Sequence, residues 1–151
     1  MMNLSLKFMN LALDEAKKAF DLDEVPVGSI IVKNGEVISA GFNQVLSNNS
    51  VTSHAEMNAI FSANQKLNNY RLVDCDIYVT LEPCHMCAKA IVDARLKNLF
   101  FGALEPKTGA ILSVDRFLDS NYLNHRVHYS SGYLAAESAK LLQSFFQSKR
   151  Y

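Results

Sequence analysis

Apolar positions along the chain follow two periods, and each period predicts a different kind of element. Spacing of three and four residues indicates four helices, over Leu4–Phe20, about His54–Lys66, about Cys84–Ala94, and a last one with apolar residues from Leu134 to Phe146. Short β-rich runs indicate five strands, over Val27–Val32, Val37–Phe42, Ile77–Thr80, Leu99–Phe101 and Val127–Tyr129.

Turn and cap residues connect these elements into one architecture. Asn34-Gly35 separates the first two strands and predicts a tight hairpin, because both residues tolerate positive φ. Thr52-Ser53 offers an N-cap for the second helix, and Pro83 suits the first turn of the third. The strand-helix-strand units imply parallel pairs and the hairpin adds an antiparallel one. We therefore expect an α/β fold with a mixed five-stranded sheet covered by helices, as a single domain over residues 1–151.

Composition and charge narrow the function classes. The chain is 49% hydrophobic, and fifteen basic and fifteen acidic side chains cancel, which is a weak footprint for nucleic-acid binding. The second half, residues 81–151, is modestly basic and permits a local phosphate-binding patch. Three cysteines cannot all pair, so we expect a reducing compartment. No run approaches the roughly 18 apolar residues of a membrane span, so we expect a cytoplasmic protein with no membrane partner.

Cys84 and Cys87 are compatible with a redox pair, a disulfide or half of a metal site. Their i, i+3 spacing puts both sulfurs on one helix face. His54 at the start of another helix supplies a third donor, and three protein ligands leave a zinc ion a position for water. Glu56 follows two residues later and is placed to accept a proton from that water. Cys75 lies among apolar residues and is expected to be a small buried side chain.

The order H-x-E…P-C-x-x-C is the signature of zinc-dependent nucleobase deaminases. Beyond it, "EVPVGSIIV", "YVTLEPCHMC", "KTGA" and "NHRV" make the chain resemble the bacterial tRNA-specific adenosine deaminases of the cytidine deaminase superfamily. This resemblance implies a three-layer α/β/α, cytidine deaminase-like fold. It implies conversion of adenosine to inosine at the wobble position of a tRNA anticodon stem-loop, by a homodimer with one zinc per subunit.

The resemblance also assigns roles to individual residues. It implies that zinc is held by His54, Cys84 and Cys87, and that Glu56 shuttles protons. It implies that Asn43 hydrogen-bonds the flipped base, that Val27 lines the base pocket and that the Ala55 backbone helps to position the base. It further implies that four residues lie near the RNA: Glu105, Lys107, Asn124 and Arg126.

Two other functions stay open on the sequence alone. The first is a deaminase of free nucleobases or nucleosides, of the guanine or cytosine type, which zero net charge and "HAEMNAI" favour. The second is a non-enzymatic zinc module that binds RNA or protein. Glu56 argues against this second function, because a purely structural zinc site needs no proton shuttle.

Overall fold

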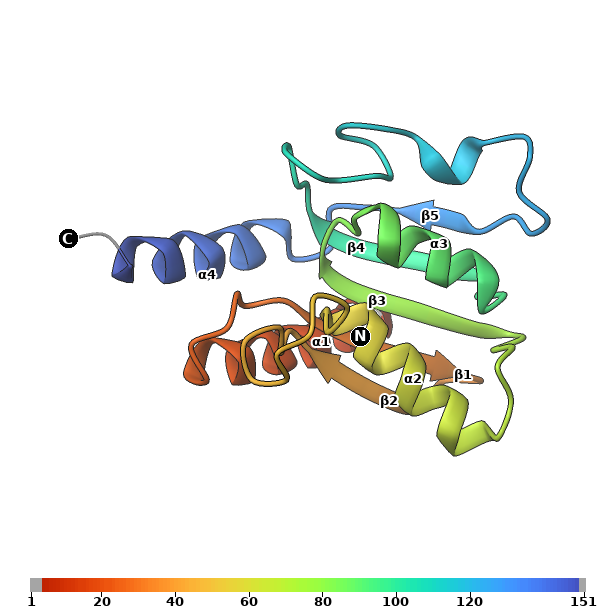
Figure 1. The fold of residues 1–151 in the computed structure, drawn as a ribbon, viewed down its shortest axis with the longest axis horizontal. Helices are drawn as coiled ribbons and strands as arrows, with labels where there is room; N and C mark the ends of the chain where they lie inside the picture. The colour runs from red at the N-terminus through yellow and green to blue at the C-terminus, as the bar shows by residue number, and fades with distance from the viewer. Residues whose placement is uncertain (1–3, 150–151) are drawn as a thin grey trace.

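A five-stranded sheet in the order β2-β1-β3-β4-β5 forms the centre of the structure, a computed structural model in which residues 4–149 are described (Figure 1). β1 pairs antiparallel with both β2 and β3, whereas β3-β4 and β4-β5 are parallel, so the predicted mixed sheet is confirmed. The strands are β1 (Gly28–Lys33), β2 (Glu36–Phe42), β3 (Cys75–Leu81), β4 (Asn98–Ala103) and β5 (His128–Ser130).

Helices cover both faces of the sheet, which confirms the expected three layers. One face carries α2 (Ala55–Leu67) and α3 (His85–Asp93), and the other carries α1 (Leu4–Asp21) and α4 (Ala135–Ser148) (Figure 1). A 3-10 turn, η1 (Phe117–Asp119), interrupts the long connection between β4 and β5 and was not predicted.

The alternation of side chains along the strands divides the core into two parts. Ile31 of β1 and Val79 of β3 belong to the core under α2 and α3, while Ile30 and Tyr78 belong to the core under α1. Both faces of the central strands are therefore buried, as expected for a sheet between two helix layers. The Tyr78 ring stacks on Phe100 with a centroid distance of 4.6 Å.

The turn and cap predictions were mostly reliable, with two errors. Pro83, expected in the first turn of the third helix, precedes the N-cap Cys84 and lies outside α3. Asn34 and Gly35 have φ values of 52° and 77°, so the predicted hairpin turn is confirmed. The prediction that Thr52-Ser53 caps the second helix is wrong, because the N-cap is His54. The Ser53 hydroxyl instead donates to Asn58 Oδ1 at 3.2 Å and accepts from Asn48 at 2.9 Å, which ties the preceding loop to the helix.

Within residues 4–149, no helix combines the length and the apolar character that crossing a bilayer requires. The single domain over residues 1–151 stays a prediction, and residues 1–3 and 150–151 lie outside the described part.

Gly41 sets how closely α2 lies against β2. A Cβ at this position would lie 2.5 Å from the carbonyl oxygen of Ala55 and 2.6 Å from the amide nitrogen of Ala59. Both atoms belong to helix backbone, so the helix would have to move to make room. The absence of a side chain at Gly41 therefore fixes the start of α2, the segment that contains the candidate site.

We expect Gly41→Ala to lower the free energy of unfolding by about 1–3 kcal/mol, because it overpacks a helix backbone. The displacement should also weaken zinc retention, since Ala55 directly follows His54. Chemical denaturation and metal analysis measure both effects. Ala40→Ser, which adds one atom at the exposed neighbouring position of the same strand, is the matched control. A Gly41→Ala protein as stable as this control would show that the helix-strand contact tolerates a methyl group.

Candidate metal centre and substrate cavity

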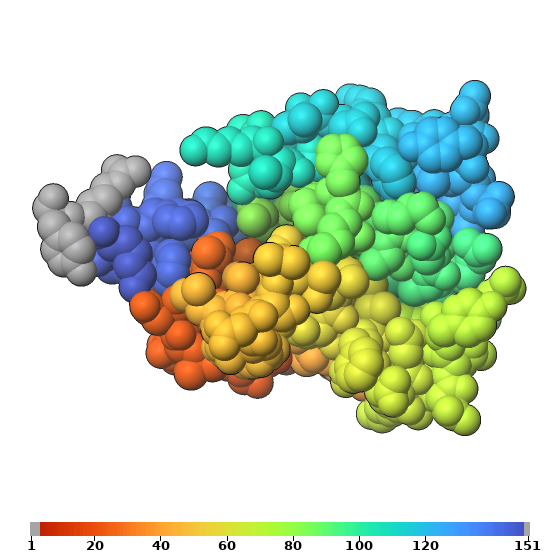
Figure 2. Space-filling model, viewed as in Figure 1, coloured from red at the N-terminus to blue at the C-terminus, as the bar shows by residue number. Residues whose placement is uncertain are grey.

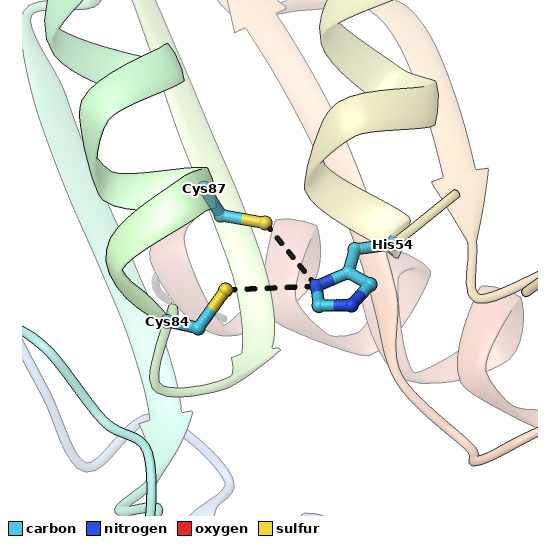
Figure 3. Close-up of side chains that lie close together, drawn as sticks. All are labelled: His54, Cys84 and Cys87. Atoms are coloured by element: carbon cyan, nitrogen blue, oxygen red, sulfur yellow. Dashed lines mark hydrogen bonds between the residues drawn. The ribbon is translucent and has the colours of Figure 1, made fainter. Parts of the chain in front are cut away.

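The candidate metal centre lies where two helices begin side by side. His54 is the N-cap of α2 and Cys84 is the N-cap of α3, and both have extended backbone with φ of −76° and −78°. Neither side chain makes a capping hydrogen bond. Ser, Thr, Asp and Asn normally occupy this position because their oxygens cap the helix. Here a histidine and a cysteine occupy it, and their side chains turn toward each other (Figure 3).

The three donor atoms have the spacing that a tetrahedral zinc ion requires. His54 Nδ1 lies 3.7 Å from Cys84 Sγ and 3.5 Å from Cys87 Sγ (Figure 3). Zn–N and Zn–S bonds of about 2.05 and 2.3 Å at tetrahedral angles separate nitrogen from sulfur by about 3.6 Å. All three donors lie within 4.8 Å of one another. One imidazole and two thiols at these distances fit a zinc ion with three protein ligands.

The electrostatics of the site favour a thiolate. Hydrogen bonding from the Cys87 thiol, together with His54, lowers the pKa of Cys84 to about 3. The same interaction raises the pKa of Cys87, because its proton is shared with the Cys84 sulfur. The N-termini of two helices add partial positive charge at this point. The site therefore supplies at least one sulfur in the form that binds metal.

Glu56 lies in the first turn of α2, beside the three donors but outside the cluster that they form. Its side chain is 4% exposed, and burial raises its pKa to about 7. A carboxyl group with a pKa near neutrality exchanges protons readily at physiological pH, which is the property of a general acid-base group.

A cavity of about 610 Å³ lies against this cluster, lined by His54, Glu56 and Cys84. It is at the sheet edge where β3 and β4 end, the usual position for ligands in open α/β sheets. Loops after α1, β2 and β4 and the end of α4 complete its wall. Figure 2 shows these segments, coloured from orange to blue, meeting on one side of the molecule.

Most of the predicted site residues meet at this cavity. Val27, Asn43, Ala55 and Glu105 line it with the three residues above. Cys87 completes the metal cluster from a fully buried position. Cys75 is buried away from the cluster, as expected.

The predicted RNA-contacting residues divide into two places. Lys107 is exposed on the loop after β4, between the cavity-lining residues Glu105 and Thr108, and its backbone amide donates to Glu105 Oε1 at 3.0 Å. Asn124 and Arg126 instead line a separate hollow of about 230 Å³. That hollow precedes β5, which runs parallel to β4, so it lies toward the opposite end of the strands from the candidate metal donors. The fold of the chain therefore does not bring Asn124 and Arg126 together with the other candidates.

Sequence reasoning missed several cavity residues, above all two buried glutamates. Glu24 is 1% exposed and accepts hydrogen bonds from Leu46 N at 3.0 Å and from the Ser47 amide and hydroxyl, each at 2.6 Å. Burial alone would raise the pKa of Glu24, but these hydrogen bonds lower it below its ordinary value. Glu82 behaves in the same way: burial opposes ionisation, and donors from Leu112, Ser113 and Glu105 lower its pKa. The available signal was a carboxylate within each of the apolar, proline-containing stretches "EVPVG" and "LEPC".

Phe145 and Lys149, at the end of α4, also line the cavity and were predicted only as part of a helix. The Lys149 ammonium lies 5.3 Å from the Phe145 ring centroid and pairs with Asp23, which links α4 to the loop after α1. Their contribution depends on how the last helix docks, which residue spacing within that helix does not reveal.

Comparison of the chain with known proteins identifies its family. Residues 2–103 match the family model described as the cytidine and deoxycytidylate deaminase zinc-binding region. The chain is 48% identical over 143 residues to a tRNA-specific adenosine deaminase of Aquifex aeolicus, covering 95% of this chain and 94% of that one. A solved structure from work on A-to-I editing by tRNA:A34 deaminases superposes with a TM-score of 0.87 at 44% identity, covering 89% of this chain and 98% of that one. A guanine deaminase of Bacillus subtilis superposes with a TM-score of 0.63 at 30% identity, covering 95% and 92%.

We expect Cys84→Ala to lose zinc and part of the protein's thermal stability, because the metal links the starts of α2 and α3 and its binding free energy adds to that of folding. Metal analysis of the purified variant and thermal unfolding with and without a chelator measure these effects. Cys75→Ala is the matched control, since it removes a buried cysteine outside the cluster. Stoichiometric zinc in Cys84→Ala would overturn the three-ligand site.

Proposed function

This chain belongs to the cytidine and deoxycytidylate deaminase family, and we propose that within this family it is the enzyme that converts adenosine to inosine at the wobble position of a tRNA anticodon. The observation that carries the proposal is that the three metal donors and Glu56 adjoin one cavity at the ends of β3 and β4. Its volume of about 610 Å³ lies within the range of roughly 300–1,000 Å³ that accepts a small ligand, so a nucleotide extruded from a loop fits.

His54, Cys84 and Cys87 are the residues that would hold zinc. When bound, zinc lowers the pKa of a coordinated water and makes it a nucleophile near neutral pH. The overall reaction consumes one water and releases ammonia, as the exocyclic amine of adenine is replaced by oxygen at C6.

Glu56 moves the protons of this reaction. Its carboxylate accepts a proton from the attacking water and delivers it to a ring nitrogen, then assists the departure of the amine as ammonia. Burial suits Glu56 to this role, because it brings the pKa of the carboxyl group close to the pH at which both transfers occur.

The base is oriented by residues from three segments. Asn43 is at the end of β2, and its backbone amide donates to the carbonyl of Val27 at 3.1 Å, which holds the two on the same part of the wall. The Asn43 amide side chain hydrogen-bonds the base, Val27 packs against its ring, and Ala55 presents helix backbone to it. Glu105 and Lys107 on the adjacent loop contact the polynucleotide on either side of the target.

The small-substrate alternative loses one of the two features that favoured it. Asn58, part of the "HAEMNAI" stretch, donates to the Phe42 carbonyl at 2.8 Å and accepts from the Ser53 hydroxyl at 3.2 Å. This side chain connects β2 to α2 and is not among the residues that line the cavity. Asn58 therefore serves local structure, and it gives no support to recognition of a free base.

We further propose that the enzyme is a cytoplasmic homodimer. The support is the resemblance to the tRNA deaminases, together with exposed apolar side chains along α2 and the loop after it, at Phe61, Tyr70 and Val73. Large apolar side chains exposed on one region are typical of surfaces that bind another protein.

We expect Glu56→Gln to reduce turnover by about 10²- to 10⁴-fold, the usual contribution of a general acid-base group, while zinc stays bound. Glutamine preserves the size of the side chain but cannot accept the proton. Single-turnover deamination and metal analysis on the same preparation give the two measurements. Complete loss of zinc would identify Glu56 as a ligand, and near-normal turnover would remove it from the mechanism.

We expect an anticodon stem-loop with wobble adenosine to be deaminated orders of magnitude faster than free adenosine, because contacts outside the base supply binding energy. Rising salt should weaken this preference through loss of phosphate contacts. Lys107→Ala should flatten the salt dependence by about one unit of slope, as expected for one lost phosphate contact. Lys33→Ala, at the end of β1 away from the cavity, is the control. Equal rates on stem-loop and nucleoside at all salt concentrations would favour a small-substrate deaminase.

A further inference from the structure

Glu82 is the most extensively hydrogen-bonded side chain beside the cavity. It lies between the end of β3 and the zinc-ligand segment, and it is 3% exposed. Oε1 accepts from the Glu105 amide at 2.9 Å and from the Ser113 hydroxyl. Oε2 accepts from the amides of Ile111, Leu112 and Ser113 at 3.1, 2.7 and 2.9 Å.

All five donors come from one loop, residues 104–113, which follows β4. Glu105 is near the beginning of this loop and the other three residues form its end, so the carboxylate holds both ends at once. The loop also wraps around it: a Cβ on Gly109 would overlap the Glu82 carboxyl group. The amide of Ala110 adds a hydrogen bond of 2.9 Å to the carbonyl of Pro83.

These contacts leave Glu82 no capacity for chemistry of its own. A carboxylate has about four lone-pair positions, and five donors already occupy its two oxygens. Among residues 4–149 none of the ion pairs involves Glu82, so its charge is compensated by backbone amides and one hydroxyl. Glu82 is thus suited to holding backbone in place, although it borders the cavity.

The held loop contains the side chains that reach the cavity rim. Glu105 and Thr108 line the cavity, and Lys107 is exposed between them. Because Glu82 is two residues from Cys84, it fixes this rim relative to the start of α3 and hence to the metal ligands. A rim that is already in place before substrate arrives lowers the entropy cost of binding.

We propose that Glu82 is a positioning residue that presets the loop 104–113 as the polynucleotide-contacting rim of the active site. This inference rests on the proposed function, since it takes RNA flanking the target base as what the rim contacts. It assigns Glu82 to substrate binding and leaves proton transfer to Glu56.

The test is Glu82→Gln, which keeps the shape but turns one acceptor oxygen into an NH₂ group facing N–H donors. We expect KM for the anticodon stem-loop to rise about tenfold or more, kcat to change less than threefold, and zinc to remain at one per chain. Asp93→Asn makes the same chemical change at an exposed carboxylate on α3 and is the control. A fall in kcat with unchanged KM would overturn the proposal, because it would place Glu82 in the chemical step.

Backbone hydrogen exchange tests the anchoring independently of any substrate. In Glu82→Gln the amides of Glu105 and of residues 111–113 should lose protection, while those of α2 and α3 keep theirs. Unchanged protection, or lost protection with unchanged KM, would overturn the positioning role. A wild-type enzyme inactive on the stem-loop would refute the proposed function. The exchange result would still show whether Glu82 holds the loop 104–113 in place, because it needs no substrate.

Ser113→Ala gives a second, milder variant in case Glu82→Gln fails to fold. It removes one of the five donors and keeps the carboxylate. We expect a smaller rise in KM, about two- to fivefold, with exchange increased only near residue 113. A KM equal to that of the wild type together with unchanged exchange would count against the anchor.

Discussion

The structure depends on one constraint: the N-termini of α2 and α3 must lie side by side. Their N-cap residues, His54 and Cys84, come from segments thirty residues apart in sequence, and their donor atoms lie 3.7 Å apart. Parallel pairing of β3 with β4 places α3 as the crossover between them, and the missing side chain at Gly41 lets α2 approach β2 on the same face. The cavity, the metal donors and Glu56 all occupy the space that this convergence creates.

Elements and metal donors could be predicted from sequence because each is determined by local pattern. Alternation and helical spacing fix the strands and helices. The i, i+3 spacing correctly brought the two cysteines together, although Cys84 is the N-cap of α3 and only Cys87 lies within the helix. The cap of α2 could not be predicted from residue type, since Ser53 is the better capping residue but its hydroxyl already binds Asn48 and Asn58. The capping preference of Ser53 is overridden there by hydrogen bonds that form only in the folded loop.

Positions that depend on the docking of distant segments were beyond the sequence. Phe145 reads as core, and it is indeed buried, yet it also lines the cavity because α4 ends beside the loop after α1. Asn124 and Arg126 were grouped with Lys107 by resemblance, and the topology separates them, because the segment before β5 lies toward the other end of the strands. The roles of Glu24 and Glu82 were likewise not predictable. Each carboxylate holds a loop more than twenty residues away in sequence, and no rule of residue spacing predicts such a contact.

Histidine and cysteine at the N-caps of α2 and α3 also lower the stability of the metal-free chain. Replacing a good N-cap by a residue that does not cap typically costs about 0.5–2 kcal/mol, and α2 and α3 both lack a capping side chain. Serine or aspartate at either position would cap the helix of the metal-free chain better, but it would remove a metal donor and with it the binding free energy that the metal adds to folding. The absent caps are therefore a cost that the metal-free chain bears, and the bound metal offsets it. The two helix starts thus depend on metal for stability that a capping side chain would supply without it.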